Sequence, residues 1–208
     1  MSTKFQKRLW LCAGMLLLLL TACTPSQATA TIEPTQAEIA TVTMAEHAAT
    51  TGQTIAPFEL SGIAFEAEAV IPDRYSCKGE DISPELYWGD PPAGTQSFAL
   101  LFNDPEARSS GWMHWVVYNI PAEARGLSEA IQPGAIIEGT MVHGSSDWGT
   151  LEYGGPCPPQ GVTHRYVFTL YALDTLLDLD PGSSKTELIA AMDEHILAQI
   201  ELAANFTR

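Results

Sequence analysis

Apolar and polar residues alternate with a period of two along much of the chain after residue 57, which is typical of β-strands with one buried face. Between Ile63 and Ile71 the apolar side chains alternate with Glu66 and Glu68, and this predicts a half-exposed strand. Other apolar runs, rich in aromatic and β-branched residues and separated by Gly/Pro loops, predict strands over 86–88, 97–103, 112–120, 136–142 and 165–173. We therefore expect a mainly β fold of sandwich or barrel-like architecture.

One segment near the C-terminus has helical periodicity instead. Ser184 and Glu187 have the spacing of a capping box, which marks the start of a helix. Apolar residues then recur on one helical face at Leu188, Ile189, Met192, Ile196, Ile200 and Ala203. This pattern predicts an amphipathic C-terminal helix that packs on a sheet. His195 lies beside the apolar stripe, so we expect it to be a boundary residue without a functional role.

The first 56 residues have a different character. Three cations precede an apolar stretch over 9–20, which is too short to span a bilayer comfortably and ends in small residues. The motif Leu20-Thr21-Ala22-Cys23 resembles the bacterial lipobox, which implies that residues 1–22 are a lipoprotein signal peptide and that Cys23 carries fatty acyl chains such as palmitate. An ordinary secretory signal or a short membrane anchor is the alternative. Residues 23–56, rich in Thr, Ala, Gln, Glu and Pro, predict a disordered tether, and the folded domain is expected over 57–208.

Charge narrows the possible partners. The chain has 25 acidic and 10 basic residues, a net charge of −15. Removal of residues 1–22 takes away three cations and no acid, so the net charge becomes −18. This balance is the reverse of that in general nucleic-acid binders. Anionic lipid also repels such a body, so acyl chains rather than electrostatics would hold it on the outer, extracytoplasmic side of a bacterial membrane.

Residues with hydrogen-bonding side chains gather at the ends of three predicted strands. Asp104 follows the 97–103 strand. Trp112 and His114 would share one face of a strand over 112–120, and His164 and Tyr166 would share one face of a strand over 164–172. Two histidines and a tyrosine suit a phosphate or carboxylate ligand, and Asp104 would orient a histidine or bind a cationic part of the ligand. The alternative is that these side chains are structural and only satisfy buried strand ends.

The residues next to these candidates are expected to face away from the site or to form its wall. Alternation places Met113 and Trp115 on the face opposite His114, and Arg165 opposite Tyr166. The Gly/Pro-rich loop 154–161 would form a rigid wall that offers backbone N–H groups to an anion.

Three blocks occur in order along the chain: Asp104-Pro105, WMHWVVYNIP over 112–121, and GPCPPQG over 155–161 followed by His164-Arg165-Tyr166. Together they resemble the phosphatidylethanolamine-binding protein family, in its bacterial Raf-kinase-inhibitor-like branch, over residues 58–206. The resemblance implies a large central sheet, a smaller second sheet and a C-terminal helix, together with a small anion pocket. By position, the pocket residues would be Asp104, Trp112, His114, Pro158, Pro159, His164 and Tyr166, with Trp88 nearby. Glu106-Ala107-Arg108 stands where family members often have a second Asp followed by Ala-Pro.

Other chemistry is less well supported by the sequence. Cys77 and Cys157 could form one disulfide in an exported domain or remain as buried thiols. We expect no cofactor and no metal, because the two candidate histidines and Asp104 lack short ligand spacing. A serine-hydrolase elbow is absent from the sequence, and Ser145 and Ser146 are expected to form a turn with His143 in the same loop.

The sequence thus predicts a membrane-tethered, extracytoplasmic binding protein for phosphate- or carboxylate-type groups, phospholipid headgroups among them. The alternatives are an inhibitor or modulator of an exported protein partner and a metal- or histidine-dependent phosphoester hydrolase.

Overall fold

The computed structural model describes residues 57–208. The predicted signal peptide, Cys23 and the tether over 23–56 lie outside the described residues. Within the described part of the chain, no helix is long and apolar enough to cross a membrane.

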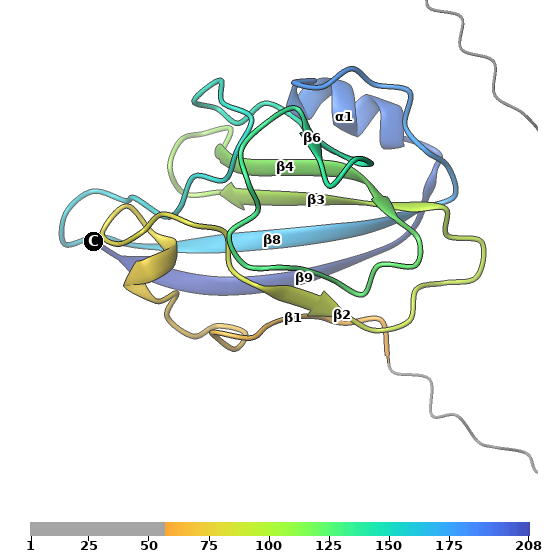
Figure 1. Ribbon diagram of the computed structural model, residues 1–208. Coiled ribbons are helices and arrows are strands. Elements are labelled where there is room, and N and C mark those ends of the chain that lie inside the picture. The colour runs from red at the N-terminus through yellow and green to blue at the C-terminus, as the bar shows by residue number, and fades with distance from the viewer. Residues whose placement is uncertain (1–56) are drawn as a thin grey trace, which may run out of the picture. The chain divides into compact units, whose positions relative to one another are not determined.

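Two antiparallel sheets form the fold (Figure 1). The smaller sheet has the strand order β1-β2-β5, with bounds Leu60–Gly62, Leu86–Trp88 and Gly126–Leu127. The larger sheet has the order β6-β7-β4-β3-β8-β9. In this sheet β3 is Ser97–Asp104, β4 is Trp112–Pro121, β6 is Ile136–Ile137, β7 is Met141–His143, β8 is Thr163–Leu173 and β9 is Ile196–Thr207. The mainly β prediction with a large and a small sheet is confirmed.

The large sheet buries both of its faces. Phe98, Leu100 and Phe102 of β3 pack into an aromatic core shared with the small sheet. Ala99 and Leu101, which alternate with them, pack into a second core with the helix α1 (Lys185–Met192). Because successive strand residues point to opposite faces, a strand buried on both sides appears as the continuous apolar run seen in the sequence.

The predicted C-terminal helix is present but ends early. The capping box of Ser184 and Glu187 is formed, and α1 runs only from Lys185 to Met192. Residues 196–207, which the helical pattern included in part, form β9 along β8. Alternate residues of β9 bury against the aromatic core, namely Ala198, Ile200, Leu202, Ala204 and Phe206. This segment fits both periodicities, and pairing with β8 along its whole length favours the strand.

Two strand predictions are wrong in extent. The predicted strand over 63–71 is replaced by an irregular segment after β1, in which Glu68 has a φ of 61° that ends extended structure. Only Val70 makes an isolated bridge, to Asn205. The predicted strand over 136–142 is a hairpin of β6 and β7, because Glu138 and Gly139 have positive φ and turn the chain.

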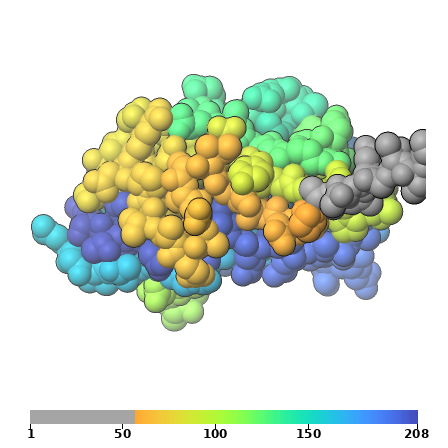
Figure 2. All heavy atoms as spheres, turned by 90° about the horizontal axis from the view of Figure 1, so that it is seen from below, coloured from red at the N-terminus to blue at the C-terminus, as the bar shows by residue number. Residues whose placement is uncertain are grey.

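The irregular segment covers an edge of the large sheet. The backbone N–H groups of Glu68 and Ile71 donate to the carbonyls of Ala203 and Asn205 on β9. Figure 2 shows this orange and yellow part of the chain lying across the dark-blue atoms of β9. An edge strand that is covered in this way is protected from pairing with another chain.

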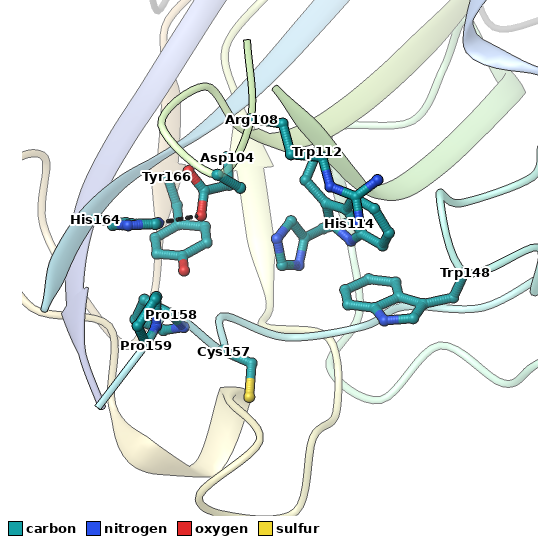
Figure 3. A pocket seen from close by; sticks show the side chains of 11 residues that line it. Asp104, Arg108, Trp112, His114, Trp148, Cys157, Pro158, Pro159, His164 and Tyr166 are labelled. Carbon is teal, nitrogen blue, oxygen red and sulfur yellow. Dashed lines mark hydrogen bonds and ion pairs between the residues drawn. The ribbon is translucent and has the colours of Figure 1, made fainter. Parts of the chain in front are cut away.

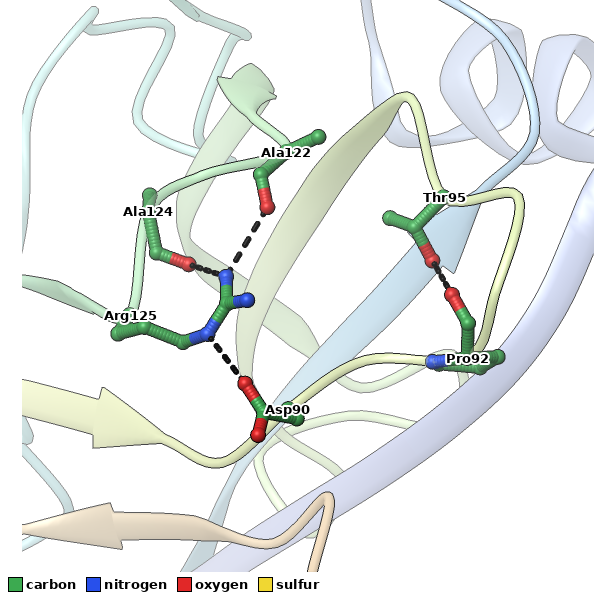
Figure 4. Close-up of polar contacts among 6 residues, drawn as sticks. All are labelled: Asp90, Pro92, Thr95, Ala122, Ala124 and Arg125. Carbon is green, nitrogen blue, oxygen red and sulfur yellow. Dashed lines mark hydrogen bonds and ion pairs between the residues drawn. The ribbon is translucent and has the colours of Figure 1, made fainter. Parts of the chain in front are cut away.

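Arg125 joins two loops at the end of the fold opposite the site described below. Its guanidinium donates to the carbonyls of Ala122 and Ala124 and to the carboxylate of Asp90, at 2.9–3.2 Å (Figure 4). Thr95 closes the neighbouring turn by donating its hydroxyl to the carbonyl of Pro92 at 2.8 Å. These contacts fix the approach to the start of β3, whose other end carries Asp104.

Candidate functional site

A cavity of about 330 Å³ lies where β3 ends and where β4 and β8 begin. Antiparallel pairing brings these three strand ends to the same edge of the sheet. Figure 3 shows the side chains around a common space, with the proline loop opposite the strand ends. The lining residues are Asp104, Ala107, Arg108, Trp112, His114, Trp148, Cys157, Pro158, Pro159, His164 and Tyr166.

Asp104 and His164 are hydrogen-bonded to each other within the cavity wall. The Nδ1–H of His164 donates to Oδ2 of Asp104 at 2.7 Å, and their side chains are 13% and 3% exposed. The second carboxylate oxygen of Asp104 accepts the backbone N–H of Glu106 at 2.9 Å. With Nδ1 held by the carboxylate, Nε2 is the ring atom of His164 left for a ligand.

His114 is buried at the start of β4, where the Nδ1–H donates to the carbonyl of Gly154 at 2.8 Å. Burial lowers the pKa of His114, although the bond to Gly154 and the charge of Asp104 partly oppose this shift. The imidazole is therefore neutral at pH 7, with Nε2 available to accept a proton or a hydrogen bond from a ligand. The ring stands edge-on to Tyr166, with centroids 5.3 Å apart.

Two buried donors of the cavity wall lack partners. The hydroxyl of Tyr166, a residue with no exposed surface, and the indole N–H of Trp112 find no hydrogen-bond acceptor among residues 57–208. Burial, and after it the charge of the nearby Asp104 carboxylate, raise the pKa of Tyr166, so its hydroxyl stays protonated. The hydroxyl approaches that carboxylate, but the contact falls short of hydrogen-bond geometry. An unpaired buried donor costs about 1–3 kcal/mol, and an acceptor supplied by a ligand would remove that cost.

The two residue pairs that the strand pattern places on a common site both face the cavity. Trp112 and His114 line the cavity, as do His164 and Tyr166, while Arg165 is exposed and paired with Glu68. The expectation for Met113 and Trp115 is wrong, because they pack into opposite cores. The register shift between Phe102 and Asn103 places a bulge at His114, and the alternation is broken there.

Arg108 is a cavity residue that the strand pattern did not identify. Its guanidinium lies over the ring of Trp112 at 4.0 Å, at the mouth of the cavity. The loop that carries it is held to β8 by Glu106, whose carboxylate accepts the backbone N–H of Arg165 at 2.5 Å. Arg108, in the segment 106–108 that differs from the family pattern, is thus the only Lys or Arg among the lining residues.

Trp148 is a second residue found only in the structure. It stands edge-on to His114, with centroids 4.9 Å apart, and to Trp112 at 5.4 Å. The loop before it is tied to β4, since Asp147 and Met113 exchange two hydrogen bonds of 2.6 and 2.9 Å. The motif Gly144-Ser145-Ser146-Asp147 suggested only a turn, so nothing in the sequence marked the indole that follows it as part of the cavity.

The proline loop forms a wall, but it offers fewer amides than the sequence suggested. The N–H of Gly154 donates to the carbonyl of His114, and the N–H of Gly155 donates to Oδ1 of Asp81 at 2.7 Å. Both groups are therefore unavailable to an anion. Cys157 in the same wall is joined to Cys77 by a disulfide with a Cα–Cα distance of 5.5 Å.

Two histidines and one tryptophan do not belong to the cavity. Trp88 packs edge-on against Phe98 in the core, near the start of β3 rather than its end, which corrects its expected place near the pocket. His143 is a buried residue of β7 rather than part of a loop, and its Nε2 accepts the indole N–H of Trp115 at 3.0 Å. His195 is exposed and donates to Asp174 at 2.8 Å.

Metal-ligand geometry is not found in the described part of the chain. No group of three or more His, Cys, Asp or Glu side chains is placed to hold an ion between residues 57 and 208. The polar groups of the cavity instead combine hydrogen-bond donors, one guanidinium and a carboxylate already paired with a histidine.

Comparisons with known proteins point to one family. A family model described as phosphatidylethanolamine-binding protein matches residues 61–207. A UPF0098 protein of Methanothermobacter thermautotrophicus is 48% identical over 145 residues, which cover 70% of this chain and 95% of that protein. The UPF0098 protein YbhB of Escherichia coli is 41% identical over 132 residues, covering 62% and 84% of the two chains.

Solved structures agree with these relatives. A putative phosphatidylethanolamine-binding protein homologue of Chlamydia trachomatis, CT736, is 37% identical with a TM-score of 0.66. Escherichia coli YbcL, described as a member of the mammalian PEBP family, is 30% identical with a TM-score of 0.67. Each match covers 74% of this chain and 99% of the solved one.

Proposed function

The chain belongs to the phosphatidylethanolamine-binding protein family, and from that premise we propose that it binds a compact phosphate or carboxylate group in the cavity between the ends of β3, β4 and β8. At about 330 Å³ the cavity is at the small end of ligand-binding pockets. A free anion or a phospholipid headgroup is of suitable size, whereas a whole lipid is not.

The observation that carries the proposal is the pair of unpartnered donors. The hydroxyl of Tyr166 and the indole N–H of Trp112 are buried in the wall without an acceptor. An anion with two or more oxygens would accept from both, and charge-assisted hydrogen bonds of this kind are stronger than neutral ones.

The charges of the wall support an anion over a cation. The carboxylate of Asp104 already accepts the Nδ1–H of His164 at 2.7 Å and the backbone N–H of Glu106 at 2.9 Å, so both of its oxygens have partners within the fold. Arg108 then supplies an unshared positive charge at the mouth, since its guanidinium contacts the face of Trp112 rather than a carboxylate. Nε2 of the neutral His114 would accept a hydrogen bond from the P–OH group of a monohydrogen phosphate, a role that a cationic imidazole could not fill.

Calorimetric titration of the purified domain with inorganic phosphate tests the proposal. We expect saturable binding of one phosphate per chain, with acetate competing for the same site. If neither anion binds at millimolar concentration, the proposed function is wrong. Turnover of a phosphoester that His114→Ala abolishes would instead favour the hydrolase alternative.

We further propose that the protein is a lipoprotein, tethered through Cys23 to the extracytoplasmic side of a bacterial membrane. The support is the sequence motif at 20–23 together with the cationic and apolar segments before it. Replacing Cys23 with serine removes the thiol that carries the acyl chains. Cys23→Ser is expected to move the protein from the membrane fraction to the soluble fraction after cell fractionation. Unchanged membrane association of Cys23→Ser would contradict the lipid anchor.

A further inference from the structure

The cavity wall presents several hydrogen-bond donors and one nitrogen that can only accept. The donors are the hydroxyl of Tyr166 and the indole N–H of Trp112, which lack partners in the described part of the chain, and the guanidinium of Arg108 at the mouth. The acceptor is Nε2 of His114, because Nδ1 of the same ring carries the proton that is donated to the carbonyl of Gly154 at 2.8 Å. Figure 3 shows the nitrogen-bearing edge of this imidazole directed across the cavity toward Tyr166.

The fold holds His114 in this neutral tautomer. The residue is 3% exposed, and its hydrogen-bond partner is an uncharged carbonyl. The N–H of Gly154 also donates to the carbonyl of His114 at 3.2 Å, so two hydrogen bonds tie the residue to the loop and fix which nitrogen faces the cavity. Burial lowers the pKa of His114, which acts in the same direction. His164 differs, because its partner is the carboxylate of Asp104. His114 is therefore the histidine of the cavity whose partner cannot compensate a second proton on the ring.

A buried acceptor among donors divides oxyanions into two classes. An oxyanion that carries a proton, such as hydrogen phosphate, can donate its P–OH group to Nε2 of His114 while its other oxygens accept from Tyr166 and Trp112. A fully ionised oxyanion such as sulfate instead places a lone pair against Nε2, or forces a proton onto a buried imidazole, and either outcome costs free energy. Carboxylates and phosphodiesters belong to the second class, because at neutral pH they have no proton to donate.

We propose that His114 makes the cavity selective for oxyanions that carry a proton, so that free hydrogen phosphate is preferred over sulfate, carboxylates and the phosphodiester group of a membrane lipid. This inference rests on the proposed function and ranks the anions that the cavity accepts. Tyr166, Trp112 and Arg108 donate to any oxyanion and so provide affinity. His114 provides the discrimination, because its Nε2 pairs only with a ligand that donates.

The test uses tetrahedral anions of equal charge that differ in one proton. Calorimetric titration of the unaltered protein is carried out at constant ionic strength and above the second pKa of phosphate. Phosphate and arsenate are then singly protonated dianions, whereas sulfate and selenate are dianions without a proton. We expect phosphate and arsenate to bind about 10–100-fold more tightly than sulfate and selenate, because the unprotonated anions leave a buried acceptor unpaired. Dimethyl phosphate, a diester without a proton, should bind no more tightly than sulfate.

The tested variant is His114→Gln, whose side-chain amide can turn an N–H group toward the anion. The preference for phosphate over sulfate should fall toward one in this variant, and thermal unfolding checks that it is folded. His195→Gln is the matched control, since His195 is exposed and does not line the cavity, and it should keep the full preference.

Nitrogen NMR of the unaltered protein gives a readout that needs no variant. Nε2 of His114 should stay unprotonated in the phosphate complex and become protonated when sulfate is bound at saturating concentration. A protonated Nε2 in the phosphate complex, or sulfate and selenate binding as tightly as phosphate and arsenate, would show that the selectivity is wrong while the anion site stands. The same conclusion follows if folded His114→Gln keeps the full preference. If none of these anions binds, the proposed function itself fails.

Discussion

Replacing both Cys77 and Cys157 with serine is expected to lower the free energy of unfolding by about 4.5 kcal/mol. The disulfide joins residues 80 positions apart, and the loop-entropy model gives about this value for a loop of that length. For a domain of this size the unfolding midpoint should fall by roughly 10–15 °C. Thermal unfolding of the oxidised protein and of the double variant, followed by circular dichroism, measures the difference.

The folded structure should survive the loss of the disulfide. The wall stays attached through the N–H of Gly155 on Asp81 at 2.7 Å and the hydroxyl of Tyr153 on the carbonyl of Tyr75 at 2.7 Å. Reducing agent is the control: it should destabilise the unaltered protein to a similar extent and leave the double variant unaffected. Equal midpoints for oxidised protein, reduced protein and double variant would contradict this account.

Tyr166→Phe is expected to weaken phosphate binding by about 10–100-fold, because a hydrogen bond to a charged group contributes about 1.5–3 kcal/mol. The same change should leave the free energy of unfolding unchanged or raise it by up to about 1 kcal/mol, since the hydroxyl that it removes is buried without a partner. Calorimetric titration and thermal unfolding measure the two quantities. Loss of affinity without loss of stability would distinguish a ligand contact from a structural one.

Tyr171→Phe is the matched control for Tyr166→Phe. Tyr171 lies on the same strand, β8, and does not line the cavity. Phosphate affinity should be unchanged in that variant. If Tyr166→Phe binds phosphate as well as the unaltered protein does, the hydroxyl is not a ligand contact and the observation that carries the proposed function is lost.

Sequence periodicity predicts elements well where it is unambiguous. The doubly buried β3 and β4 appear as apolar runs, and the capping box of Ser184 and Glu187 marks the start of α1. Residues 196–207 satisfy helical spacing at Ile196, Ile200 and Ala203 and strand spacing at alternate residues. The segment becomes a strand rather than a helix because it pairs with the edge of β8, which is distant in sequence.

The candidate site was predictable where strands carry it. Asp104, His114, His164 and Tyr166 lie on or at the ends of strands that pair antiparallel, which brings all four to one edge of the sheet. Alternation accounts for the shared face of His164 and Tyr166, whereas the bulge at His114 breaks it on β4. Arg108 and Trp148 come from loops. Loop conformation depends on contacts such as those of Asp147 with Met113, which link residues 34 apart and leave no periodic signal.

The sequence also does not show which backbone amides are already hydrogen-bonded within the fold. The sequence predicts a Gly/Pro wall at 154–161 whose backbone N–H groups could bind an anion. In the structure, the N–H groups of Gly154 and Gly155 are used by His114 and Asp81. A buried amide is satisfied by whichever acceptor the fold brings near, and Asp81 lies 74 residues away in the chain. The donors left over for a ligand are side chains, and only the three-dimensional contacts reveal which ones remain unpaired.

The most direct test of an anion site between β3, β4 and β8 is titration of the protein with inorganic phosphate while the imidazole nitrogen signals are followed by NMR. We expect the signals of His114 and His164 to shift and saturate together, because both rings line the cavity. The signal of His143, which is buried on β7 and bonded to Trp115, should stay unchanged as an internal control. If the His114 and His164 signals do not move at millimolar phosphate, or if His143 shifts equally with them, the cavity is not the anion site proposed here.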